Sequence, residues 1–194
     1  TVTIGETTFK LDRPFLVMAT QNPVDQEGTY PLPEAQVDRF MLKVVINYPT
    51  KEQEMEVMRR ISNMQFDFKV NTMLTKEDIF AIREQVNQVK ISESLERYII
   101  ELVYATRKPL EYKLNEQAQY IQFGASPRAS INLNLASKAM AYMDGRDYVL
   151  PEDIKEVAMD VMNHRIILNY EAEADNVKTT DIISVLLTKV PISR

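Results

Sequence analysis

The chain has 194 residues, with 28 acidic and 23 basic side chains and a formal net charge of −5. Hydrophobic residues make up 45% and charged residues 26%, which excludes a disordered chain, a collagen-like fibre and a simple coiled coil. It contains no cysteine, which excludes disulfides, thiolate metal sites and cysteine nucleophiles. Only 4 glycines are present, which indicates a helix-rich chain with little room for glycine-rich phosphate loops.

The N-terminal residues do not have the basic and apolar regions of a signal peptide. No apolar run approaches the ~18 residues that are needed to span a bilayer. The acidic charge balance argues against non-specific nucleic-acid binding, which needs a basic surface. We therefore expect a cytoplasmic protein with no nucleic-acid partner and no membrane span.

The first fifty residues are rich in β-strand signals. Residues 3–11 predict a hairpin, with Gly5 free to adopt a positive φ at the turn. The apolar runs 15–20 and 43–46 predict two buried strands. A short helix is predicted between them, over 34–40.

Helix-start signals recur from residue 50 onward. Thr50 and Gln53 have the spacing of a capping box, in which each side chain binds a backbone N–H of the other residue. Later helices are predicted to begin at Thr75, at Ser92 or Ser94, at Ser126, at Pro151 and at Thr180. The polar segment 108–123 gives no clear prediction. The sequence thus predicts two units, an α/β part over 1–49 and an all-helical part over 50–194.

Apolar residues at helical spacing predict the buried face of each helix. The predicted stripes include Leu95, Ile99, Leu102 and Val103, then Ile131, Leu135, Ala139 and Met143, then Ile154, Val157, Ala158 and Val161. The methionines on such stripes are interpreted as core residues, with an adaptable client-binding surface left open as the alternative. These methionines are Met55, Met58, Met64, Met140 and Met143.

Four longer motifs are more specific than these patterns. They are FLVMATQNPVDQEGTYPLPEAQVDRFMLKV at 15–44, GASPRA at 124–129, DGRDYVLPEDI at 144–154 and NHRIIL at 163–168. In this order they resemble the MoxR family of AAA+ ATPases. The resemblance implies an α/β remnant of a AAA+ core, consisting of a β-hairpin, the sensor 1 strand, a short helix and the last strand. An all-α lid domain follows it.

The resemblance also implies roles for three side chains. Asn22 follows a predicted strand and matches sensor 1, which holds the attacking water and touches the γ-phosphate. Its residue type and position alone favour a turn before proline. Arg39 matches the arginine finger, which acts in trans on the ATP of a neighbour, while its residue type alone favours a solvated helix face paired with Asp38 or Glu34.

Arg128 matches sensor 2, which joins the lid to the γ-phosphate. It lies in the first turn of a predicted helix, where a cation opposes the helix dipole, although an arginine serving as packing or pairing surface is the alternative. His164 is the only histidine, so this chain cannot form a histidine cluster for zinc or a Ser–His–Asp triad. We interpret His164 as a residue at a helix end, and we expect no metal site.

No GxxxxGK[ST] phosphate loop and no acidic Mg²⁺-binding strand are found in the sequence. The resemblance implies ATP and Mg²⁺ for an intact parent protein, which would be a ring, usually a hexamer. It also implies von Willebrand factor A domain proteins and protein clients as partners. We expect the chain by itself to be inactive as an ATPase. The alternative function is a non-catalytic helical adaptor.

Overall fold

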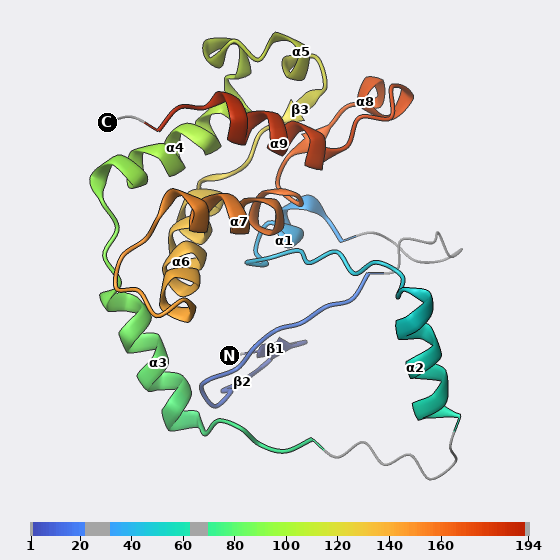
Figure 1. Ribbon diagram of the computed structural model, residues 1–194, viewed down its shortest axis with the longest axis vertical. Helices are drawn as coiled ribbons and strands as arrows, with labels where there is room; N and C mark the ends of the chain where they lie inside the picture. The colour runs from blue at the N-terminus through green and yellow to red at the C-terminus, as the bar shows by residue number, and fades with distance from the viewer. Residues whose placement is uncertain (1, 22–31, 63–69, 193–194) are drawn as a thin grey trace.

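The structure is a computed structural model that describes residues 2–21, 32–62 and 70–192. Most of these residues are helical, and the helices gather in the C-terminal two thirds of the chain (Figure 1). This arrangement confirms the predicted fold class in outline, a short N-terminal part with a β-hairpin followed by a helix-rich lid. No helix among the described residues is both long and apolar enough to cross a membrane.

The N-terminal hairpin forms as predicted. Strands β1 (Val2–Ile4) and β2 (Thr7–Phe9) pair antiparallel, and Thr3 lies opposite Thr8. Their hydroxyl oxygens are 3.0 Å apart, and Gly5 adopts a φ of 61° at the turn. The left-handed conformation at this turn is one that glycine adopts without steric cost.

The two predicted buried strands do not form. Residues 15–20 and 43–46 run without a strand partner among the described residues, and their apolar side chains are exposed, with Met18 at 83% and Ile46 at 90%. A strand needs a neighbour to satisfy its backbone groups, and an apolar run by itself supplies none. These segments are apolar, as the prediction required, but they lack the sheet that would bury them as strands.

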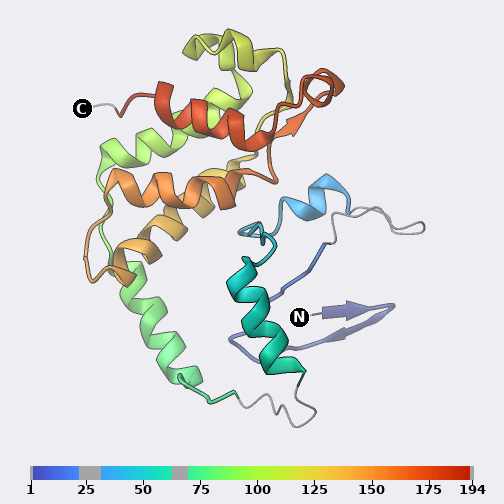
Figure 2. The same cartoon turned by 45° about the vertical axis from the view of Figure 1, so that its right-hand side comes forward.

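Two helices, α1 (Glu34–Val37) and α2 (Lys51–Ile61), lie between the hairpin and the lid. The lid comprises residues 70–192 and begins with α3 (Lys76–Gln88). The Thr50 capping box is confirmed, because the Thr50 N–H donates to Gln53 at 2.9 Å and the Gln53 N–H to Thr50 at 3.3 Å. Figure 2 shows α2 standing apart from the lid, and Met55 and Met58 on it are exposed, so the prediction that they fill the core is wrong.

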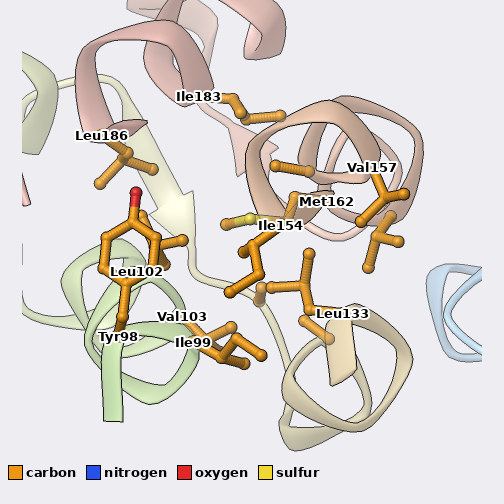
Figure 3. Packing of buried hydrophobic residues seen from close by; sticks show 14 of the residues in the cluster. Tyr98, Ile99, Leu102, Val103, Leu133, Ile154, Val157, Met162, Ile183 and Leu186 are labelled. Carbon is orange, nitrogen blue, oxygen red and sulfur yellow. The ribbon is translucent and has the colours of Figure 1, made fainter. Parts of the chain in front are cut away.

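The lid core lies between four helices. These are α4 (Glu93–Arg107), α6 (Pro127–Met143), α7 (Pro151–Met162) and α9 (Thr179–Lys189). Figure 3 shows the side chains that they contribute: Tyr98, Ile99, Leu102 and Val103 from α4, Leu133 from α6, Ile154, Val157 and Met162 from α7, and Ile183 and Leu186 from α9. The predicted stripes of α4 and α7 are confirmed.

The predicted stripe of α6 is wrong. Ile131, Leu135 and Met143 are exposed, and the buried face carries Leu133 and four small residues instead, which are Ala129, Ala136, Ser137 and Ala141. Small side chains allow α6 to approach α7 and α4 closely, so the face with more alanine becomes the packed one. Both faces of α6 carry apolar residues at helical spacing, so periodicity alone did not show which of the two is buried.

Short elements cover the far end of the lid. They are the 3₁₀ helix η1 (Pro109–Tyr112), α5 (Asn115–Ala118), β3 (Ile121–Phe123), β4 (Ile167–Leu168) and α8 (Tyr170–Ala174). β3 pairs antiparallel with β4, with Ile121 opposite Leu168. The chain then passes Gly124, where a Cβ would lie 2.5 Å from the Thr106 carbonyl oxygen, so the close approach of β3 to α4 requires glycine.

Candidate functional site

Asp38, which ends α1, is the centre of the candidate site. Its carboxylate accepts from Arg128 Nη1 at 2.8 Å and from Arg165 Nε at 3.1 Å. The Ser126 hydroxyl lies 2.8 and 2.9 Å from the two carboxylate oxygens and donates to the carboxylate. Side chains from the loop before α6, from α6 and from the turn after α7 thus converge on one residue of α1.

These neighbours stabilise the ionised form of the Asp38 carboxylate. Burial alone would raise the pKa of its carboxyl, but hydrogen bonds from Arg128 and Ser126 and the positive charges of Arg165 and Arg128 lower it. The pKa of Asp38 therefore lies below its ordinary value, and the carboxylate is ionised at neutral pH. A paired carboxylate is what makes a buried guanidinium next to it tolerable.

Arg165 is the most buried charged side chain of the site, with none of its side chain exposed. Besides the Asp38 carboxylate, it donates to the backbone oxygens of Asp38 at 3.0 Å, of Met41 at 3.2 Å, of Phe40 and of Val161. A guanidinium has five N–H donors, so each of them has a partner here. Arg165 thereby joins the end of α1 to the end of α7.

His164 reinforces the same junction. Its Nε2 lies 3.1 Å from the Phe40 carbonyl oxygen, which can only accept, so Nε2 carries the proton. Burial lowers the pKa of His164, and its buried Nδ1 has no partner among the described residues. The prediction of a histidine at a helix end is confirmed, since His164 follows the α7 C-cap residue Asn163.

The backbone after Phe40 continues along α7. The Lys43 N–H donates to the Asp160 carbonyl oxygen at 2.8 Å. Figure 1 shows α1 beside the end of α7 at this point. The segment from Asp38 to Lys43 is therefore the part of the core remnant that the lid holds.

Arg39 is exposed in the middle of this held segment. Its neighbour Asp38 makes its ion pairs with Arg128 and Arg165, so the predicted alternative of an Asp38–Arg39 pair does not form. No carboxylate of the described residues forms an ion pair with Arg39. The guanidinium is thus presented to the surroundings from a fixed backbone.

Arg128 lies in the first turn of α6, as predicted. Ser126 caps this helix, and its hydroxyl accepts from the Arg128 N–H at 3.2 Å. The Arg128 side chain is 54% exposed, and among the described residues only its Nη1 has a hydrogen-bond partner, which is Asp38. The other donors of the guanidinium have no hydrogen-bond partner among the described residues.

Of the three predicted site residues, Arg128 binds Asp38, and Arg39 follows Asp38 directly in the chain. Asn22 lies outside the described residues. Sequence reasoning did not find Asp38 and Arg165 as site residues, although both belong to motifs that it used, VDRF and NHRIIL. A buried arginine leaves no mark in hydrophobic periodicity, because its position is set by tertiary contacts.

Comparisons with known proteins agree with this arrangement. Residues 1–42 match the ATPase family associated with various cellular activities (AAA), and residues 114–185 match the AAA lid domain. The chaperone MoxR1 of Mycobacterium tuberculosis is 41% identical over 98% of this chain and 50% of its own length. Protein MoxR of Paracoccus denitrificans is 29% identical over 79% of this chain and 48% of its own length. This chain belongs to the MoxR family of AAA+ ATPases.

A solved structure supports the same fold. The crystal structure of a candidate ATPase from Cytophaga hutchinsonii is 64% identical and superposes with a TM-score of 0.92, covering 100% of this chain and 58% of that one. The chain thus spans about half the length of the curated MoxR relatives and of this structure. The activity and partners of a whole MoxR protein are therefore treated below as proposals.

Membership of a AAA+ ATPase family implies nucleotide binding in a whole MoxR protein, and the described residues fit only part of a nucleotide site. Arg39 and Arg128 are exposed cations that suit the terminal phosphate of ATP. No group of three histidine or acidic side chains among the described residues could hold a metal ion. The phosphate loop that would hold the rest of the nucleotide is not in this sequence.

Proposed function

We propose that this chain is the part of a ring-forming MoxR ATPase that completes the ATP site of a neighbouring subunit and senses its own nucleotide. Arg39 is the arginine finger that reaches the neighbour's ATP. Arg128 is sensor 2, which binds the γ-phosphate of the subunit's own ATP, and Asn22 is sensor 1, which orients the attacking water. The ring, a hexamer by resemblance, uses hydrolysis to remodel protein complexes.

One observation carries the proposal: Arg39 is exposed on a backbone that the lid holds, next to the carboxylate that binds Arg128. A finger must be exposed to reach a neighbour and must be held to reach it accurately. The planar, permanently charged guanidinium suits the charge that spreads over the γ-phosphate oxygens during transfer. Partners with von Willebrand factor A domains and the identity of the clients belong to the proposal by resemblance alone.

The test uses a protein that carries this chain together with an upstream phosphate-loop region. Arg39→Ala is expected to lower kcat for ATP hydrolysis by about 10³-fold or more and to leave ATP binding nearly unchanged. Arg97→Ala, on the exposed face of α4, is the control, because Glu93, itself exposed, is the one ion-pair partner of Arg97 within the described part of the chain. Arg97→Ala is expected to keep full activity.

The result also separates the two function classes. Retained hydrolysis in Arg39→Ala would remove Arg39 from the finger role. A protein with no hydrolysis in any form would favour the helical adaptor instead. The chain of 194 residues, assayed by itself, is expected to release no phosphate from ATP above the blank.

A further inference from the structure

The lid holds the backbone on both sides of Arg39. Arg165 donates to the carbonyl oxygens of Asp38, before Arg39, and of Phe40 and Met41, after it. His164 donates to the Phe40 carbonyl oxygen as well. Two side chains from the turn after α7 therefore fix the turn that carries the exposed Arg39.

This turn cannot fix itself. It follows α1, a helix of only 4 residues, and helices that short are not stable without tertiary contacts. The apolar runs 15–20 and 43–46 on either side of it are exposed among the described residues. Among the described residues, side-chain bonds from the lid and the bond from the Lys43 N–H to the Asp160 carbonyl oxygen are thus the principal constraints on the backbone that carries Arg39. The side chains that make these bonds are Ser126, Arg128, His164 and Arg165.

A buried ion pair such as Arg165–Asp38 contributes little net stability compared with apolar packing of the same volume. Its geometric effect is larger, because a planar guanidinium with five donors binds several oxygens in fixed directions. Arg165 also binds the same carboxylate as Arg128, through the other carboxylate oxygen of Asp38. A movement of the lid would therefore displace the Arg39 turn and Arg128 together.

We propose that Arg165, assisted by His164, is a positioning residue for Arg39, and that it ties the direction of the arginine finger to the orientation of the lid. The effect of this positioning on hydrolysis rests on the proposed finger role of Arg39. The positioning of Arg39 by Arg165 does not depend on that role, so the positioning can be measured without ATP.

The first test measures the mobility of the turn. The chain has no cysteine, so Arg39→Cys provides a single site for a nitroxide spin label. Adding Arg165→Lys keeps a positive charge near Asp38, but one ammonium cannot reach all the oxygens that the guanidinium binds. We expect a shorter rotational correlation time of the label in Arg165→Lys than in the chain labelled at residue 39 alone.

Arg146→Lys is the matched control. Arg146 also binds a buried aspartate, Asp153, with two hydrogen bonds of 2.6 and 2.8 Å, but it lies in the loop between α6 and α7. Arg146→Lys is expected to lower the melting temperature as Arg165→Lys does, and to leave the label at residue 39 unchanged. Equal label mobility in the two variants would overturn the proposal.

A second variant covers the possibility that Arg165→Lys does not fold, as judged by far-UV circular dichroism. His164→Ala removes only the bond to the Phe40 carbonyl and keeps Arg165 in place. We expect the label at residue 39 to be more mobile in His164→Ala than in the control Arg146→Lys. The gain should be smaller than the gain expected for Arg165→Lys, because the bonds from Arg165 remain. No gain in this folded variant would overturn the proposal.

The last test measures hydrolysis in the protein that includes the phosphate-loop region. Arg165→Lys is expected to lower kcat by up to about 10²-fold, as a small misplacement of a reacting group does, with unchanged ATP binding. In an Arg39→Ala background the same change should cause no further loss, because Arg165 acts through Arg39. Equal losses in both backgrounds would overturn the positioning role, whereas full activity of Arg39→Ala alone would overturn only the finger role.

Discussion

Asp38 binds two arginines that differ in exposure, and this difference separates their roles. The Arg165 side chain is fully buried, whereas that of Arg128 is 54% exposed. A partly exposed ion pair contributes only about 1 kcal/mol, so the proposed exchange of Asp38 for a phosphate costs Arg128 little. Arg165 cannot leave without placing an unpaired charge in the protein interior. The Asp38 carboxylate is thus a permanent partner of Arg165 and an exchangeable partner of Arg128.

The two pairs predict unequal stability losses. Asp38→Asn leaves Arg165 as a buried charge without a counter-ion and is expected to lower the free energy of unfolding by about 3 kcal/mol. Arg128→Ala removes only the exposed pair and should cost less than about 1 kcal/mol. Urea denaturation of both variants checks this. A larger loss in Arg128→Ala would contradict the assignment of Arg165 as the anchor.

His164 predicts a pH dependence of stability. Its pKa in the folded chain is lowered by burial, and the charges of Arg165 and Lys43 oppose its protonation while Asp38 favours it. The unfolded chain therefore binds this proton more readily than the folded chain. The contribution of His164 to the free energy of unfolding is fully present above about pH 6.5 and decreases as the pH falls below that value. His164→Asn should flatten this slope between about pH 7.5 and 5.5.

The measurement is the free energy of unfolding across that range, and His164 is the only histidine that could contribute. The pKa values of Asp38 and Asp153 are lowered in the folded chain, so their contributions are lost only at more acidic pH, below about 3.9. An unchanged slope in His164→Asn would show that the histidine is not buried at the junction.

At the scale of elements, the sequence predicted those features that depend on contacts between residues close in the chain. The caps at Thr50, Thr75 and Ser126 were predicted, because a side chain and a backbone N–H three or fewer residues away suffice to form them. The choice between Ser92 and Ser94 was settled by α4, which Ser92 caps. The strands at 15–20 and 43–46 failed, because a strand depends on distant partners.

The site follows the same division. Arg39 and Arg128 were predicted from motifs, whereas the carboxylate between them was predicted only as a surface partner of Arg39. Its contacts with Ser126 and Arg165 join residues 88 and 127 positions apart in the sequence, which no local pattern reveals. The missed features are thus the long-range polar contacts.

Helix α6 offers a direct test of its corrected face. Leu133 is fully buried, whereas Leu135, which the sequence stripe placed in the core, is 44% exposed. Leu133→Ala should lower the free energy of unfolding by about 2–5 kcal/mol, since it leaves a cavity between α4, α6 and α7. Leu135→Ala, the same change two residues away, should cost less than about 1 kcal/mol. The opposite order in urea denaturation would restore the predicted stripe.

At the scale of the whole molecule, the buried core is confined to the lid. Its buried apolar residues run from Val89 to Val190, and none of the described residues before α3 belongs to it. The hairpin, α1 and α2 are joined to the lid chiefly by the polar contacts around Asp38. The lid therefore has the core of an independent folding unit, and the remnant before it does not.

We therefore predict that residues 70–192 fold cooperatively without the rest of the chain. The helices of the lid should give the same circular dichroism per residue and a single unfolding transition. Without Asp38 and Phe40, however, Arg165 and His164 lose their partners and become exposed. The pKa of His164 should then return toward its ordinary value, which a histidine NMR titration measures in both chains. A lid that folds while the pKa of His164 stays low would show that the burial of this histidine does not depend on the Asp38 turn.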